Sequence, residues 1–364
     1  MGSRIPPIKV IRPVHTALWN PQSQALRCVE VVQELDDVRS YWFEAEGGAH
    51  FRYLPGQHLT LVLDIAGQIE YRVFTLSSTP TRPDRLCITV KTNRPDGLTF
   101  WMSRHLTVGT LVSALAPNGR FSVLSQPVAK LLLICAGSGI TPMLSTLRWL
   151  ADRQEPRDVV FIHVVSSPSR CLFDEELQAI DKCLPGLRVV QVVSRVPAGE
   201  SWSGYVGRLD RRMLGSICPT LSGFDAFCCG PQGFMQRVQQ LLQAEGFDMG
   251  RYHQESFGNG IETPIEASRQ EQPDLNADRF TLLIDDLPLE VANNELLLKA
   301  LHRQGVRLPT GCRDGLCGTC KIKLNSGVVE MKHQGGLSPK EEQAGLILAC
   351  CSRARSDVVV SRLV

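Results

Sequence analysis

No stretch of this sequence approaches the ~20 consecutive apolar residues that a membrane helix needs, so a membrane partner or span is not expected. The first residues, MGSRIPP, also lack the apolar core and cleavage site of a secretory signal, which favours the cytoplasm. Strong charge of either sign is missing as well. The net charge is +2, which gives no reason to expect nucleic acid or an anionic membrane as a partner.

Cysteine, by contrast, is plentiful, with 13 residues in a chain of 364. An odd number without an export signal disfavours a disulfide framework and favours thiolate ligands together with buried free thiols. The length exceeds what one hydrophobic core usually serves, which predicts several domains rather than one.

The pattern of residues changes along the chain and predicts three domains. Residues 25–125 carry short β-type runs broken by turn residues, which predicts an antiparallel β-barrel. Residues 126–258 carry continuous apolar runs such as LLLIC and DVVFIHVV, separated by helical stretches over 142–153 and 233–245. Buried strands alternating with helices predict a doubly wound α/β domain with a parallel sheet.

A polar stretch over 259–277 predicts a linker, and residues 1–24 an N-terminal extension. The third domain is expected over 278–364. In it FTLLIDD and LPLEVA predict a hairpin, and Asn294 is expected to cap a helix that runs to about Gln304.

The third domain contains the C-x₄-C-x₂-C…C spacing of plant-type [2Fe–2S] ferredoxins, at Cys312, Cys317, Cys320 and Cys350. Three glycines (311, 315 and 318) allow the loop to close around a cluster and to aim N–H groups at sulfur. A zinc site also accepts four thiolates, but zinc sites typically pair their cysteines in two knuckles. Cys351 adjoins the expected fourth ligand, and the extended LAC context favours Cys350. The resemblance to these ferredoxins implies an α+β, β-grasp fold.

The segment RVFTLSS matches R-x-[YF]-[ST]-x-x-S, a pattern that resembles the flavin barrels of ferredoxin reductases, with Arg72, Phe74, Thr75 and Ser78 at its key positions. The guanidinium can clamp a flavin phosphate, the ring can lie against the isoalloxazine, and the hydroxyl can serve flavin N5. A second stretch resembles the phosphate-contacting segment of the same family at Val90, Lys91, Gly97, Leu98 and Thr99. Together these motifs favour FAD.

The strand LLLIC leads into a glycine-rich turn placed directly before a helix, where a dinucleotide pyrophosphate can bind, with Gly137, Gly139, Thr141 and Pro142. CGPQGFM resembles the segment of this reductase family that meets the nicotinamide ring, and implies roles for Cys229, Gly230 and Pro231. ESFG resembles the segment that closes over the nicotinamide and flavin, and implies roles for Glu255 and Phe257.

The order of barrel, nicotinamide domain and ferredoxin is that of one branch of the ferredoxin-reductase superfamily. Within it GESWSGYVG, RYHQESFG and VEMKHQGG resemble reductase components of glycine betaine demethylases, which are Rieske-type monooxygenase systems. The resemblance implies that electrons pass from NADH through FAD and the [2Fe–2S] cluster to a Rieske oxygenase partner that demethylates a quaternary amine. It implies Thr75, Cys229 and Glu255 as the residues at the reacting centre.

Cofactor choice and partner have alternatives. Two Ser/Arg pairs, Ser169-Arg170 and Ser194-Arg195, suit the 2′-phosphate of NADPH, although V-S-R also occurs in NADH-dependent relatives, so NADH is favoured. A reductase for hybrid-cluster protein has the same domain order, and a non-catalytic redox sensor is the alternative from another class. The histidines, His58 among them, show no facial-triad spacing and are expected to be structural or exposed.

Overall fold

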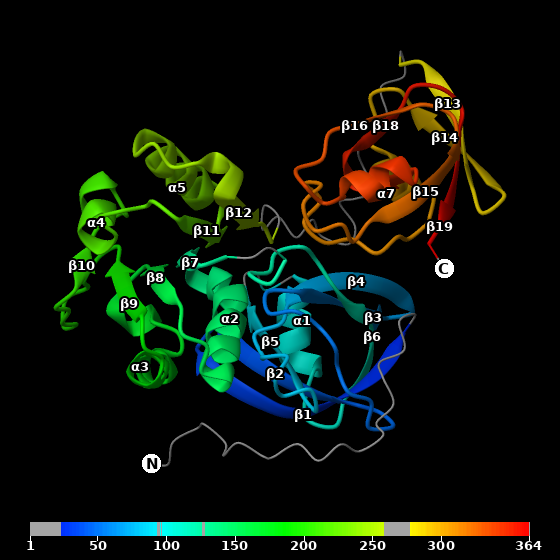
Figure 1. The fold of residues 1–364 in the computed structure, drawn as a ribbon. Helices are drawn as coiled ribbons and strands as arrows, with labels where there is room; N and C mark the ends of the chain where they lie inside the picture. The colour runs from blue at the N-terminus through cyan, green and yellow to red at the C-terminus, as the bar shows by residue number, and fades with distance from the viewer. Residues whose placement is uncertain (1–22, 93–94, 96, 126–127, 258–276, 364) are drawn as a thin grey trace.

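The computed structural model describes residues 23–92, 95, 97–125, 128–257 and 277–363. Figure 1 shows the expected order of domains, blue to cyan for the first, green for the second, and yellow to red for the third. The predicted N-terminal extension up to residue 22 and the predicted linker over 259–276 lie outside the described residues. No helix in the described part of the chain is long and apolar enough to cross a bilayer.

The first domain is an antiparallel barrel, as predicted. Its strands are β1 (Gln24–Leu35), β2 (Val38–Ala45), β3 (His58–Ile65), β4 (Gln68–Thr75), β5 (Leu86–Lys91) and β6 (Leu111–Asn118). They pair in the order β4-β3-β6-β1-β2-β5, and helix α1 (Leu98–His105) follows β5. A bridge between Leu76, just after β4, and Ile88 in β5 joins the two edges of the sheet. The barrel is closed there, which removes the exposed edge strands.

The second domain is built on a parallel sheet in the order β10-β9-β8-β7-β11-β12. The strands are β7 (Lys130–Ala136), β8 (Asp158–Val165), β9 (Leu187–Val193), β10 (Tyr205–Val206), β11 (Phe224–Cys229) and β12 (Tyr252–Glu255). The helices are α2 (Ile140–Arg153), α3 (Asp174–Cys183), α4 (Arg211–Ile217) and α5 (Gln232–Ala244), with short 3₁₀ turns η1 (Gly137–Gly139), η2 (Pro168–Arg170) and η3 (Met249–Arg251).

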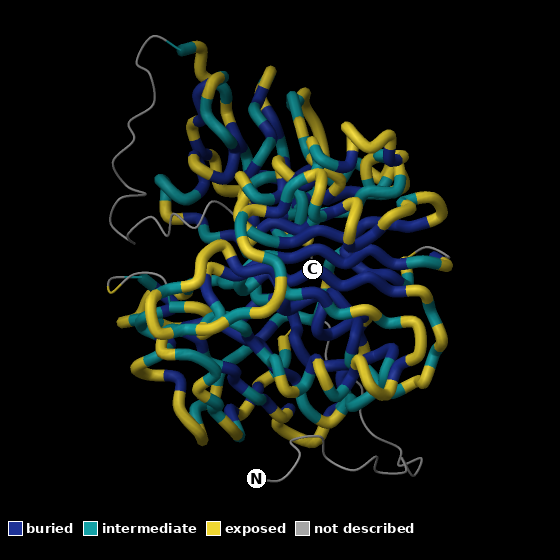
Figure 2. Tube along the Cα trace, turned by 90° about the vertical axis from the view of Figure 1, so that its left-hand side faces the viewer, coloured by how far each residue is buried: buried dark blue, intermediate teal, exposed yellow. Residues whose placement is uncertain are grey.

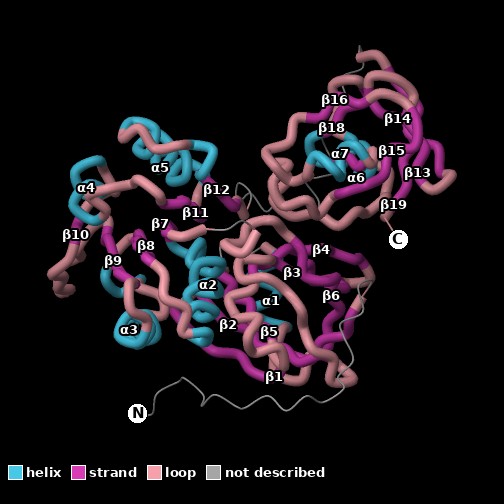
Figure 3. The backbone as a smooth tube through the Cα atoms, viewed as in Figure 1, coloured by secondary structure: helices cyan, strands magenta, loops and turns pink. Residues whose placement is uncertain are grey.

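Helices cover both faces of this sheet, as a doubly wound domain requires (Figure 3). Leu131 and Leu133 of β7 pack with α2 and α3, while the alternate residues Leu132 and Ile134 pack with α4 and α5. The central strands are therefore apolar on both faces and form the dark-blue bands of Figure 2. The strand order reverses between β7 and β11, and ligands of open α/β sheets bind beyond the carboxyl ends of the strands at such a point.

The third domain has a mixed sheet in the order β14-β13-β19-β15-β17, in which β13 and β19 are parallel. Its elements are β13 (Arg279–Ile284), β14 (Leu287–Ala292), α6 (Leu297–Arg303), β15 (Lys321–Ser326), β16 (Val329–Met331), α7 (Pro339–Gln343), β17 (Leu346–Leu348), η5 (Ala349–Cys351), β18 (Ser352–Ala354) and β19 (Val358–Arg362). Leu297 and Leu301 of α6 are buried against the sheet. The sheet therefore holds one helix across its face, as in a β-grasp fold.

The predicted cap at Asn294 is wrong. The helix begins at Leu297, and its N-cap residue is Leu296, which makes no side-chain capping bond. Leu296 instead forms an antiparallel bridge with Arg353, so this segment is extended and cannot enter the helix earlier. The helix ends at Arg303, close to the expected end at Gln304.

Candidate functional site

The residues of the flavin motif lie at the end of β4. Thr75 is buried and is the cross-strand partner of His58 at the start of β3. The Thr75 hydroxyl donates a 2.8 Å hydrogen bond to Glu255 Oε2, which belongs to the end of β12 in the second domain. Two motifs 180 residues apart therefore meet where the first two domains touch.

The other residues of the flavin motif have different surroundings. Arg72 is half-buried, and its Nη1 donates a long bond of 3.4 Å to the Tyr71 carbonyl. Phe74 packs against the barrel core. The Ser78 hydroxyl is engaged within the protein, since it contacts the Tyr53 hydroxyl at 2.8 Å and accepts the Cys87 backbone N–H at 2.9 Å.

The second predicted phosphate stretch brings a helix start to the barrel. Gly97 is the N-cap of α1, Leu98 and Thr99 are buried in its first turn, and that turn contains no acidic residue. Backbone N–H groups at a helix start attract anions. Val90 is buried at the end of β5, whereas Lys91 is exposed and lies 3.8 Å from Asp37. The Arg72 guanidinium and the backbone N–H groups at the start of α1 are donors that fit an anionic flavin dinucleotide.

The glycine-rich turn lies at the point where the strand order of the second domain reverses. A Cβ on Gly139 would come within 2.3 Å of the Cys229 carbonyl oxygen, so only glycine allows η1 to approach the end of β11 this closely. Gly230 packs in turn against Ala136, the last residue of β7. Thr141 and Pro142 follow in the first turn of α2, which also lacks acidic residues. This close backbone approach beside a helix start fits a dinucleotide pyrophosphate.

The ends of three neighbouring strands align beside this turn. In the parallel register Cys229 lies between Cys135 of β7 and Glu255 of β12. Cys229 is fully buried, and burial together with the Glu255 charge raises the pKa of its thiol well above the ordinary value. The thiol is therefore neutral, and it lies next to the Thr75–Glu255 bond. Phe257, two residues beyond β12, is 45% exposed.

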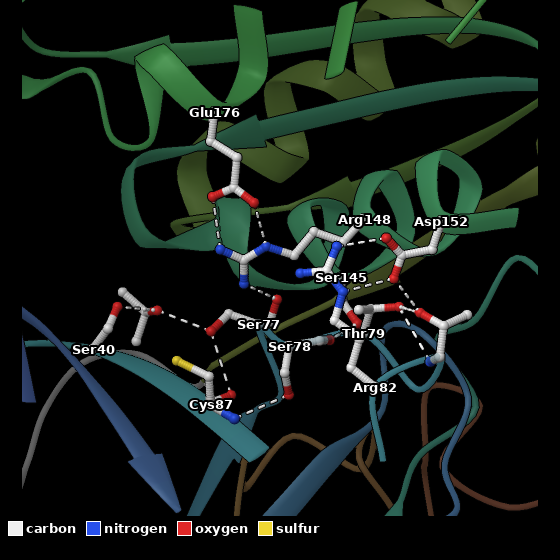
Figure 4. A network of polar contacts seen from close by, with 12 residues as sticks. Ser40, Ser77, Ser78, Thr79, Arg82, Cys87, Ser145, Arg148, Asp152 and Glu176 are labelled. Atoms are coloured by element: carbon white, nitrogen blue, oxygen red, sulfur yellow. Dashed lines mark hydrogen bonds and ion pairs between the residues drawn. The ribbon is translucent and has the colours of Figure 1, made fainter. Parts of the chain in front are cut away.

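A buried network holds the first two domains together (Figure 4). Arg148 of α2 donates two 2.7 Å bonds to the Glu176 carboxylate of α3 and one 2.6 Å bond to the Ser77 carbonyl of the barrel. Burial by itself lowers the pKa of Arg148, but the charge and hydrogen bonds of Glu176, together with the nearby Cys87 and Glu34, outweigh burial, and the pKa is raised. Ser145, one turn earlier on α2, donates to the Ser78 carbonyl at 2.5 Å. The helix that starts at the glycine-rich turn is thus bound directly to the segment that follows Thr75.

Two carboxylates occupy the region of the Ser/Arg pairs. Glu200 accepts from the Ser169 backbone N–H at 2.9 Å and from the Ser169 hydroxyl at 3.1 Å. Arg170 is ion-paired with Asp37 of the barrel. Ser194 donates its hydroxyl to the Val165 carbonyl, and Arg195 is exposed. A carboxylate therefore lies beside the first Ser/Arg pair, and it comes from a loop 31 residues after Ser169.

The four cysteines of the ferredoxin motif approach one another as two pairs, Cys312 with Cys317 and Cys320 with Cys350. In each pair one thiol donates to the other, which lowers the pKa of Cys317 and of Cys350. Within the described residues, no group of three or more His, Cys, Asp or Glu side chains surrounds a single metal position. Two pairs of sulfur ligands suit two iron ions.

The backbone of the cluster loop points toward these sulfurs. The N–H groups of Asp314, Leu316 and Cys317 donate to Cys312 Sγ at 3.3–3.4 Å. Gly315 has a positive φ of +70°, and a Cβ there would lie 2.9 Å from both Cys351 Sγ and the His333 Cα. The loop can adopt this turn only with glycine, and its donors fit an anionic iron–sulfur cluster.

The two adjacent cysteines near the C-terminus differ in burial. Cys350 is 4% exposed and faces Cys320. Cys351 is partly exposed, and its thiol lies 3.7 Å from the Leu348 carbonyl. Cys351 also hydrogen-bonds the Cys350 thiol. The deeper burial of Cys350 and its contact with Cys320 fit the sequence-based preference for Cys350, and the choice between the two cysteines stays a prediction.

Of the sequence-predicted residues, the structure gathers Thr75, Cys229 and Glu255 at one place and the four ferredoxin cysteines at another. Their roles stay predictions. Sequence reasoning missed Glu200 and Arg148, because their contacts join segments far apart in the chain. The sequence predicted that His58 is structural or exposed, and no sequence pattern marks its contact with Thr319 in the third domain.

Comparison with known proteins identifies a family for each of three successive parts of the chain. Three family models match, described as an oxidoreductase FAD-binding domain over residues 26–123, an oxidoreductase NAD-binding domain over 133–240 and a 2Fe-2S iron-sulfur cluster binding domain over 284–355. The cofactors of the chain are accordingly FAD, a nicotinamide dinucleotide and a [2Fe–2S] cluster.

Relatives match along almost the whole chain. The stachydrine N-demethylase reductase subunit of Rhizobium meliloti is 36% identical over 93% of this chain and 96% of its own length. The glycine betaine monooxygenase reductase subunit of Chromohalobacter salexigens is 36% identical over 96% of this chain and 98% of its own length. Among solved structures, phthalate dioxygenase reductase is 23% identical, with a TM-score of 0.58 over 93% of this chain and 97% of that chain. The similarity to phthalate dioxygenase reductase shows that the two chains share a fold.

Proposed function

Because the chain belongs to the family of monooxygenase reductase subunits with FAD-binding, NAD-binding and 2Fe-2S domains, we propose that it transfers electrons from NADH to a Rieske-type oxygenase which demethylates a quaternary amine such as glycine betaine. The observation that carries this proposal is the similarity to two such reductase subunits over more than nine-tenths of the chain. When bound, FAD accepts a hydride from the nicotinamide and releases single electrons, which the [2Fe–2S] cluster carries onward.

The proposed reacting centre is the junction of Thr75, Glu255 and Cys229. In the proposal the Thr75 hydroxyl lies at flavin N5, where its oxygen can accept from the N5–H of the reduced flavin, and its 2.8 Å donation to Glu255 holds that hydroxyl in place. The neutral, buried Cys229 thiol offers the nicotinamide ring an uncharged contact, which favours a dry site for hydride transfer.

The remaining proposed contacts follow the motifs. For FAD they are Arg72, Phe74, Ser78, Val90, Lys91, Gly97, Leu98 and Thr99. For the dinucleotide they are Gly137, Gly139, Thr141, Pro142, Ser194, Arg195, Gly230, Pro231 and Phe257. For the cluster they are Cys312, Cys317, Cys320 and Cys350. The proposed domains cover residues 25–125, 126–258 and 278–364. An extension over 1–24 precedes the first domain, and a linker over 259–277 separates the second domain from the third.

We propose NADH rather than NADPH as the physiological reductant. A 2′-phosphate on the ribose would meet the Glu200 carboxylate beside Ser169, and Asp37 already neutralises Arg170. A ribose hydroxyl, by contrast, can donate to Glu200. The wild-type protein should therefore show a higher kcat/KM for NADH than for NADPH.

Glu200→Gln tests this choice, because it removes the charge but keeps the shape. The ratio of kcat/KM for NADH over NADPH should fall about tenfold, which corresponds to ~1.4 kcal/mol of lost repulsion. Glu245→Gln, which alters an ion pair with Arg211 on a different helix, should leave the ratio unchanged. A ratio that is unaffected by Glu200→Gln would contradict the assignment.

The reducing state of the cysteines supports a cytoplasmic location in this proposal. All 13 cysteines lie within the described residues, and none of them forms a disulfide there. Free thiols and thiolate ligands persist in compartments where glutathione and thioredoxin keep cysteine reduced.

The partner is tested by reconstitution. The holoprotein is combined with a purified betaine-type Rieske oxygenase, NADH, oxygen and a quaternary amine, and formaldehyde is measured. In a parallel reaction it is offered oxidised hybrid-cluster protein, which a reductase of the same domain order could also serve. Formaldehyde formation that depends on the protein supports the proposal, whereas rapid reduction of hybrid-cluster protein with no formaldehyde from any amine tested would overturn it.

A further inference from the structure

His58 is the buried side chain at which the three domains meet. The residue is almost fully buried, at 1% exposure, and it lines a cavity of about 460 Å³ together with residues from all three domains. Its Nδ1 lies 3.6 Å from Glu255 Oε1, just beyond hydrogen-bond length, and has no hydrogen-bond partner within the described residues. A buried polar atom of this kind requires an explanation.

The other ring nitrogen of His58 faces the cluster loop. Its Nε2 lies 3.4 Å from the Thr319 hydroxyl oxygen, and that hydroxyl donates a 3.1 Å bond to Cys317 Sγ. A cluster thiolate can only accept, and the Thr319 hydroxyl has one proton, which goes to sulfur. The Nε2 of His58 must therefore be the donor in its contact with Thr319.

The barrel leaves room for this ring. A Cβ on Gly119 would lie 2.8 Å from His58 Nδ1 and 2.9 Å from its Cε1, so any larger residue would displace the imidazole. The next residue, Arg120, donates a 2.8 Å bond to the Leu337 carbonyl of the third domain. The same barrel loop thus fixes the position of His58 and binds the ferredoxin domain.

We propose that His58 is a positioning residue for electron transfer between the flavin site and the cluster. It completes a continuous series of contacts, Thr75–Glu255–His58–Thr319–Cys317, with successive distances of 2.8, 3.6, 3.4 and 3.1 Å. Through Thr319 it holds the hydroxyl that donates to Cys317, and it sets the placement of the cluster loop against the barrel. The inference rests on the proposed function, because it assigns Cys317 to the cluster and Thr75 to the flavin.

Two measurable effects follow from this arrangement. A hydrogen bond to a ligand sulfur stabilises the more negative, reduced cluster and so raises its reduction potential. Loss of the bond should therefore shift the midpoint potential of the cluster to more negative values. Loss of the placement should also slow electron transfer from flavin to cluster, while hydride transfer from NADH to the flavin continues.

Matched pairs of variants of the full-length holoprotein test the proposal. Thr319→Val removes the hydroxyl at nearly constant shape, and Thr319→Ser keeps it. His58→Leu removes the donor, and His58→Gln can still donate an N–H to Thr319. Arg120→Met is the control for docking alone, since it breaks the bond to Leu337 without touching the His58–Thr319 contact.

The readouts are the cluster midpoint potential, from an EPR-monitored redox titration, and the rate of cluster reduction after anaerobic mixing with NADH. Thr319→Val and His58→Leu should shift the potential in the negative direction and slow cluster reduction about tenfold, while Thr319→Ser and His58→Gln stay near wild type. Arg120→Met should slow the rate without the potential shift. The proposal is overturned if Thr319→Val and His58→Leu leave the potential unchanged, or if His58→Gln behaves as His58→Leu does. Failure of NADH to reduce the flavin in the wild type would instead refute the proposed function.

Discussion

The buried ion pair between Arg148 and Glu176 offers a quantitative test of how the first two domains are held together. Arg148 makes two 2.7 Å bonds to Glu176 and one 2.6 Å bond to the Ser77 carbonyl, and its side chain is 11% exposed. Removing one partner of a buried pair costs ~3–5 kcal/mol, because the other charge stays buried without compensation. Glu176 is 28% exposed and can regain some water, so Arg148→Met should lower the free energy of unfolding by about 3 kcal/mol.

The assay is thermal unfolding followed by flavin fluorescence, which reports release of FAD from the barrel. For a unit of 150–250 residues a loss of about 3 kcal/mol lowers Tm by roughly 6–12 °C. Arg153→Met is a control on the same helix, since its ion pair with Glu155 is 3.7 Å long and the arginine is 58% exposed. The control should lose less than about 1 kcal/mol. An Arg148→Met protein as stable as the control would refute the reasoning.

Three further predictions follow from the site. The proposed cluster ligands are Cys312, Cys317, Cys320 and Cys350. Serine at any one of them should abolish the visible and EPR signals of the cluster while FAD remains bound, whereas Cys351→Ser should keep both signals. Arg72→Ala should purify with little FAD, because a charge-assisted bond worth ~1.5–3 kcal/mol is lost, and normal flavin content would contradict this. Burial lowers the pKa of His163 from 6.5 to about 4, so the unfolded chain binds a proton there that the folded chain does not. The free energy of unfolding, measured with urea, should therefore fall by about 1.4 kcal/mol per unit as the pH drops from 6.5 to 4, and His163→Gln should reduce this slope.

The sequence predicted those parts of the fold in which local pattern and burial agree. LLLIC and DVVFIHVV became β7 and β8 because strands covered on both faces must be apolar throughout. The barrel strand β6 has a weaker local signal. The sequence of β6, LVSALAPN, contains a proline and only moderate β-formers, so its pairing depends on β1 and β3 rather than on local preference.

The functional residues also divide into those that a local motif marks and those that only long-range contacts bring together. The cluster-loop cysteines and the glycine-rich turn are short local motifs, and the spacing within each motif is enough to predict which of its residues lie together. Glu200 could not be found in this manner, since it reaches Ser169 from a separate loop. His58 contacts residues 197 and 261 positions away, and such long-range packing leaves no trace in local sequence.

The central claim is that this chain carries electrons from NADH through FAD to its [2Fe–2S] cluster. The most direct measurement is anaerobic mixing of the holoprotein with one equivalent of NADH, with flavin absorbance followed by stopped flow and the cluster followed by freeze-quench EPR. The account predicts that the flavin bleaches first and that the EPR signal of the reduced cluster then appears. A flavin that bleaches while the cluster stays oxidised, or a cluster reduced equally well in Arg72→Ala protein lacking FAD, would contradict it.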